Sequence, residues 1–178
     1  MKLSVFKIFK YSRRASIIAT VGGLIVIFGG TSAYAAHSNA LPGSTLYPLK
    51  QLWEQGQLLL SFSPTSKAQA QIDIAHDRIK AAQTVVSQTP AATNGSNAIP
   101  ALQEAQKRLS NALDQASDIS DPIQKKEIKD DIAKEAAEVE AELEQENESE
   151  SASDSDKQDI QHTSDEIKKV KDQASSND

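Results

Sequence analysis

The sequence predicts an all-α protein: an N-terminal transmembrane helix, a small antiparallel bundle of three to four helices, and a disordered acidic tail. Three observations lead to this fold class. A long uncharged segment lies near the N-terminus, prolines stand where helices can begin, and apolar residues behind those prolines recur every three or four positions. Proline is well tolerated at the first helical position, because the N–H that it lacks would have no partner there.

The uncharged segment is predicted to cross a membrane. It runs from Ala15 to Ala36, and at about 1.5 Å per residue its length matches a bilayer core of roughly 30 Å. The preceding residues 1–14 carry five basic residues and no acidic one, which places that end in the cytoplasm. The lipid bilayer is therefore the first predicted partner, and the rest of the chain is expected to be extracytoplasmic.

A cleaved signal peptide is the alternative interpretation of the same segment. Its most apolar part, residues 17–28, is short enough for a signal peptide, and Ala33-Tyr34-Ala35 fits the small-x-small pattern of a cleavage site near Ala35. Cleavage there would release the chain as a secreted protein. Both interpretations export everything that follows.

The exported part is predicted to hold a helical domain over residues 48–146, behind a connecting corner at 37–47. Pro48, Pro64, Pro100 and Pro122 mark the expected helix starts, so the helices should cover 48–61, 64–88, 100–117 and 122–146. The last three show narrow apolar seams of the kind that pairs helices. Their residues are Ala68, Ile72, Ala75, Ile79, Ala82 and Val86; Leu102, Ala105, Leu109, Ala112, Leu113 and Ala116; and Ile128, Ile132, Ala136, Val139 and Leu143.

The first helix carries the apolar residues Leu49, Leu52, Trp53, Leu59 and Leu60. Its leucines and Trp53 are expected to cover one end of the bundle, and Tyr47 and Trp53 to lie either in the core or at the headgroup level of the membrane. Many seam residues are alanines, which bury little area. The fourth helix is therefore expected to splay or to pair in a homodimer.

Residues 147–178 are predicted to be a disordered acidic tail. The stretch 144–159 reads EQENESESASDSDKQD, and so few apolar residues cannot offset the entropy of ordering. A short frayed helix is expected at most over residues 165–172.

Composition argues against several classes of function. The chain has 19 basic and 25 acidic residues, and five of the basic ones precede the membrane segment, so the exported part is too acidic for a nucleic-acid partner. It has no cysteine, and its three histidines show no paired spacing, so we predict no cofactor, no metal site and no catalytic site. Asp73 and His76 are expected to form a hydrogen bond on a solvated face, and Arg78 either an ion pair or hydrogen bonds that cap neighbouring carbonyls.

The stretch LPGSTLYPLK at residues 41–50 resembles a bacterial family known only as a domain of unknown function, in which an LPGSxLYPLK signature follows a membrane segment. The resemblance covers about residues 38–88 and extends at most to the helix expected at 100–117; beyond residue 120 no likeness is apparent. It implies an extracytoplasmic helical domain with no assigned activity. The structural signature residues are Leu41, Pro42, Gly43, Leu46, Tyr47, Pro48, Leu49 and Lys50, with Trp53 and Arg78 on the helices that follow.

Two functions are compatible with these features. The first is a non-catalytic interaction or scaffold module of the cell envelope, with an envelope protein or a second copy of the chain as its partner. The second is an extracytoplasmic sensor that works with a separate membrane partner, because fourteen cytoplasmic residues are too few for an effector domain.

Overall fold

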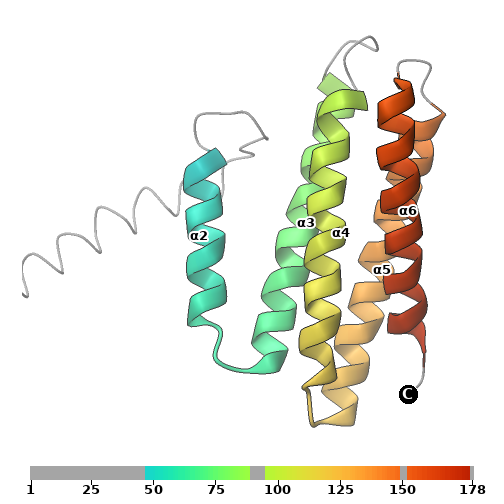
Figure 1. Cartoon of the computed structure of the whole chain (residues 1–178). Coiled ribbons are helices and arrows are strands. Elements are labelled where there is room, and N and C mark those ends of the chain that lie inside the picture. Colours follow the sequence, from blue (N-terminus) through green and yellow to red (C-terminus); the bar gives the residue numbers. More distant parts are fainter. Residues whose placement is uncertain (1–46, 89–94, 149–151, 177–178) are drawn as a thin grey trace, which may run out of the picture.

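The computed structural model describes residues 47–88, 95–148 and 152–176. They form five helices and no strand, which confirms the all-helical prediction for this part of the chain (Figure 1). None of these helices is both long and apolar enough to cross a membrane, and the predicted span at residues 15–36 lies outside the described residues. The helices are α2 (Tyr47–Leu60), α3 (Pro64–Gln88), α4 (Gly95–Ser117), α5 (Pro122–Asn147) and α6 (Asp154–Ser175).

The predicted starts at Pro64 and Pro122 are confirmed, and in each helix the residue before the proline caps the first turn. At α3 the Ser63 hydroxyl accepts the backbone N–H of Ser66 at 3.1 Å. At α5 the Asp121 carboxylate accepts the backbone N–H groups of Ile123 and Gln124, so two amides that lack helical partners are satisfied.

The start predicted at Pro100 is wrong, because α4 begins five residues earlier and contains this proline. Ala98 and Ile99, which precede it, are both buried in the core. Extending the helix upstream places these two side chains in the core. The cost is one backbone hydrogen bond, the one that an N–H at Pro100 would have donated.

Helices α3 to α6 pack around a single core. Helices α4 and α5 contact each other, and each also contacts both α3 and α6, whereas α3 and α6 do not contact each other within the described residues. The predicted seams supply most of this core: Val86 and Leu113 are half-buried at its edge, and the other predicted seam residues are all buried. Figure 1 shows α3 and α4 side by side, with α5 and α6 as the second pair.

The predicted disordered tail is wrong over residues 154–175, which form α6. Ser153 and Asp156 make a reciprocal capping box at its start. Ile160, Ile167, Val170 and Ala174 lie on one face and are buried against the rest of the bundle. The charged residues between them dilute the apolar content of the segment but leave this helical spacing intact. Because α6 covers α5, the expectation that α5 splays is also wrong, while homodimer formation stays a prediction.

Candidate functional site

Helix α2 is amphipathic, but it presents the opposite face to the bundle from the one expected. Lys50 and Glu54, one turn apart, are buried against the bundle. Three of its leucines do not cover the end of the bundle, because they point away from it: Leu52 is 66% exposed, Leu59 80% and Leu60 72%. The side chains that α2 buries most fully are thus charged, and its apolar face is left uncovered.

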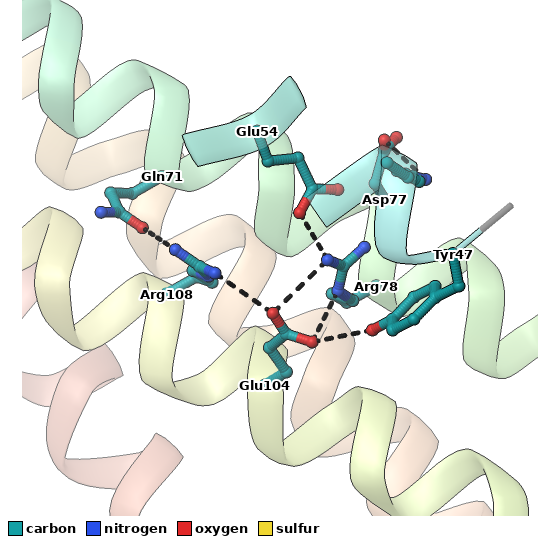
Figure 2. A network of polar contacts seen from close by, with 8 residues as sticks. Tyr47, Glu54, Gln71, Asp77, Arg78, Glu104 and Arg108 are labelled. Atoms are coloured by element: carbon teal, nitrogen blue, oxygen red, sulfur yellow. Dashed lines mark hydrogen bonds and ion pairs between the residues drawn. The ribbon is translucent and has the colours of Figure 1, made fainter. Parts of the chain in front are cut away.

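A buried guanidinium group forms the centre of these contacts. Arg78 of α3 is 0% exposed, and its Nη2 lies 2.5 Å from Oε2 of Glu54 on α2. Its Nε lies 2.8 Å from Oε2 of Glu104 on α4. One cation therefore joins three helices through two carboxylates, as Figure 2 shows. We call these residues, with Tyr47, the Arg78 network.

Tyr47, the first residue of α2, completes the network from two directions. Its hydroxyl donates a hydrogen bond to Oε2 of Glu104 at 3.0 Å. Its ring lies with the centroid 5.1 Å from Cζ of Arg78, within the range of a cation–π contact. The start of α2 is therefore fixed to both α3 and α4.

Further polar contacts support the two sides of the network. On the α4 side, Arg108 donates to Oε1 of Glu104 at 3.2 Å and to the side chain of Gln71 at 3.3 Å. On the α2 side, Nζ of Lys50 lies 3.1 Å from Oδ2 of Asp77. The buried end of Lys50 thus has an acidic partner, as a buried charge requires.

The electrostatics of the Arg78 network favour its charged form. Burial lowers the pKa of Arg78, but the hydrogen bonds and charges of Glu104 and Glu54 outweigh burial, and the net shift is upward. Burial raises the pKa of Glu104, yet its bonds to Arg78, Tyr47 and Arg108 together bring that pKa below its usual value. These groups therefore keep their charges near neutral pH, which suits a structural joint better than proton transfer.

The structure brings together three of the predicted signature residues, namely Tyr47, Lys50 and Arg78, around the docking of α2. Pro48 is exposed in the first turn of α2, and Trp53 is 37% exposed, so its side chain is not a core residue. The side chains of Leu41, Pro42, Gly43, Leu46 and Leu49 lie outside what the structure describes. The predicted ion pair of Arg78 is confirmed.

Sequence reasoning missed the two glutamates that Arg78 binds. Glu54 and Glu104 lie 24 and 26 residues from Arg78, and no local spacing marks them among the other acidic residues. The predicted bond between Asp73 and His76 is wrong. Asp73 accepts from Gln69, and His76 pairs with the carboxylate of Glu135 on α5. Two acidic side chains of α5, Glu135 and Glu146, are also buried, and no spacing in the sequence marks them.

The uncovered apolar face of α2 continues around the turn into α3. Phe62 in this turn is 88% exposed. Thr65, at the start of α3, donates to Gln124 at the start of α5, so the exposed Ile123 lies at the same end of the bundle as the turn. We call Leu52, Leu59, Leu60 and Phe62 the α2 apolar face. A run of exposed side chains this large is typical of a surface that contacts a partner or a membrane.

Comparison with known proteins supports a family assignment and nothing more specific. The model of a family described as "Domain of unknown function (DUF5667)" matches residues 39–177, which include every described helix. The match therefore extends beyond the likeness expected from residues 38–88, through α5 and α6. No curated protein and no solved structure matches the chain.

Proposed function

From the premise that the chain belongs to this family of unknown function, we propose that it is a membrane-anchored, extracytoplasmic and non-catalytic interaction module of the bacterial cell envelope. In this proposal the segment from Ala15 to Ala36 spans the bilayer. Helix α2 then lies on the outer surface of the bilayer with its apolar face in the headgroup region. The bundle of α3 to α6 lies on the side of α2 away from the bilayer, where envelope proteins can reach it.

The observation that carries the proposal is the orientation of α2. A helix that faces its own protein with Lys50 and Glu54 and faces outward with leucines is the reverse of an ordinary surface helix. Left in water, Leu52, Leu59, Leu60 and Phe62 would cost several kcal/mol, since burying one such side chain is worth about 1.5–3 kcal/mol. An amphipathic helix at a membrane interface avoids this free-energy cost of exposure to water, because its apolar face enters the boundary between headgroups and acyl chains.

Chain length also favours the bilayer as the occupant of this face. Ten residues, 37–46, separate the end of the proposed span from Tyr47, and they can reach at most about 35 Å. Helix α2 has 14 residues and is therefore about 21 Å long. The anchor thus keeps the whole of α2 within reach of the membrane surface.

Trp53 provides the test, because it is the only tryptophan in the chain and lies at the edge of the α2 apolar face. We expect brominated phospholipids to quench the fluorescence of Trp53 in the full chain reconstituted in vesicles, and the aqueous quencher acrylamide to have little effect. The double variant L59E/L60E should reverse this pattern, because two carboxylates would hold the helix out of the headgroup region.

Two results of this experiment would count against the proposal. Efficient acrylamide quenching with no effect of brominated lipid would remove the bilayer as the occupant. Protection from both quenchers, unchanged by L59E/L60E, would assign the face to protein contacts. A matched control is I123E, which adds an acid to an exposed isoleucine outside α2 and should leave the lipid quenching of Trp53 intact.

A sensor that acts through a separate membrane partner is the second candidate function. The observation that favours it is that α2, the helix next to the proposed anchor, is attached to the bundle through ion pairs and a hydrogen bond. Such an attachment can be released by breaking a small number of polar contacts. In this version, release of α2 from the Arg78 network would be the signal that passes to the membrane helix.

A further inference from the structure

Three pairs of polar side chains connect α3 and α5 at successive levels along their contact surface. Their spacing shows that the two helices run parallel. The partners in every pair are 59 residues apart, so each step along α3 is matched by an equal step in the same direction along α5. Successive levels are separated by about three and about two helical turns, which keeps them on one face. The pairs are Thr65 with Gln124, His76 with Glu135, and Gln83 with Glu142.

The middle level differs from the other two because it contains an imidazole and two carboxylates. Nδ1 of His76 lies 2.9 Å from Oε2 of Glu135, whose side chain is only 7% exposed. Glu138 follows Glu135 by three residues and lies on the same side of α5. One nitrogen of His76 and one oxygen from each glutamate all lie within 4.8 Å of one another.

These side chains are only weakly held by other groups. The cation nearest to the two glutamates is Lys134, whose Nζ lies 3.6 Å from Glu135 and 3.9 Å from Glu138. Both distances exceed a hydrogen bond, and the lysine side chain is 68% exposed, so it can move into solvent. The carboxylate oxygens therefore keep lone pairs available for a ligand between α3 and α5.

We propose that His76, Glu135 and Glu138 form a binding site for a divalent transition-metal ion of the Zn²⁺ type. Neighbouring ligand atoms in a tetrahedral zinc site with bonds of about 2.1 Å lie about 3.4 Å apart. His76 and Glu135 are already close to this spacing, and rotation of the half-exposed Glu138 side chain completes a set of three protein ligands. Water would fill the remaining position.

The ligand types select the class of metal. Imidazole nitrogen with carboxylate oxygen suits Zn²⁺ and its neighbours in the first transition row. Calcium takes six to eight oxygen ligands, and magnesium keeps most of its water, so neither should bind here with comparable affinity. A bound ion would join α3 to α5 at the middle of their contact surface, on a different element pair from the Arg78 network and independently of the bilayer proposal.

The test is calorimetric titration of the full chain in detergent micelles with zinc chloride, with calcium and magnesium chloride as comparison ions. The substitutions H76A and E135Q should each weaken zinc binding by at least about 100-fold, the upper end of the range for losing an outer-shell partner. E138Q should act in the same direction and, because Glu138 is half-exposed, should not disturb folding. The matched control is H162A, which removes an exposed histidine of α6 and should leave zinc binding unchanged.

The proposal fails if zinc does not bind at millimolar concentration, or if H76A and E138Q, with unchanged helical circular dichroism, bind zinc as the parent chain does. Binding that survives these substitutions would show only diffuse association with surface carboxylates. Equal affinities for zinc and calcium would contradict the assigned metal class. A melting temperature that zinc raises in the parent chain and in H162A, but not in H76A, would support a link between α3 and α5.

Discussion

Replacing Arg78 with methionine is expected to lower the free energy of unfolding by about 3–5 kcal/mol and to release α2 from the bundle. Methionine retains much of the length of the side chain but none of its charge. Glu54 would then be a buried carboxylate without its cation, and Glu104 would keep only Tyr47 and Arg108. Undocking α2 would return Glu54 to water, so hydrogen exchange should show loss of protection in α2 amides before that of the other helices.

Arg108 offers the control for this substitution. It binds the same glutamate from the partly exposed side, so R108M should cost no more than about 1 kcal/mol and leave α2 docked. Equal protection of α2 in R78M and the parent chain would show that the Arg78 network does not hold this helix.

Acid should release α2 as well, in a direction that follows from the pKa of Glu104. This pKa is lower in the folded chain than its usual value. The stabilisation that the ionised Glu104 carboxylate gives the folded chain is therefore fully present above the unfolded pKa of about 4.3. It is lost as the pH falls through the lowered folded pKa. The same hydrogen-exchange measurement should therefore show α2 protection falling below about pH 4 in the parent chain.

The second large effect is expected in the centre of the bundle. Ile132 of α5 is 0% exposed, and I132A should lower the free energy of unfolding by about 3–4 kcal/mol, because it removes apolar contacts and leaves a cavity. Urea unfolding followed by circular dichroism measures this loss. The slope of the free energy of unfolding against urea concentration should stay unchanged if the fold is kept.

The same helix supplies an isoleucine control for I132A. Ile123 is 71% exposed, so I123A should change stability by less than about 0.5 kcal/mol. Similar losses for the two variants would mean that α5 is not packed as described. A small loss for I132A alone would indicate a loosely packed, alanine-rich core that collapses around the deleted side chain.

Sequence patterns predicted the inner helices well, for simple reasons. Pro64 and Pro122 fix helix starts through their own covalent geometry, and the residues before them supply the caps. The apolar seams of α3, α4 and α5 repeat every three or four residues, so their burial follows from helical periodicity. The start of α4 could not be read in this way, because tertiary burial of Ala98 and Ile99 outweighs the preference of proline for the first position.

The predictions that failed depend mainly on contacts between residues far apart in the sequence. Helical spacing identifies a stripe on α2, but it does not say whether that stripe faces the bundle or its surroundings. The apolar positions of α6 do keep a helical spacing, and Ser153 with Asp156 forms a capping box, yet a composition rich in charge hides both signals. The partners of Arg78 and of His76 come from other helices, and only the packed fold brings them together.

Helix α2 meets the bundle with its polar face, and in the proposed function its outward apolar face contacts the bilayer. The chain has no cysteine, so single nitroxide labels can be placed by L60C and L58C, two residues apart and on opposite sides of this helix. In the full chain in vesicles, the label at 60 should collide with lipid-soluble oxygen far more than with an aqueous nickel chelate, while the label at 58 should be immobilised. A label at 60 that is immobilised against protein, or that meets the nickel chelate as freely as a label at the exposed residue 147, would show that this face of α2 does not contact the bilayer.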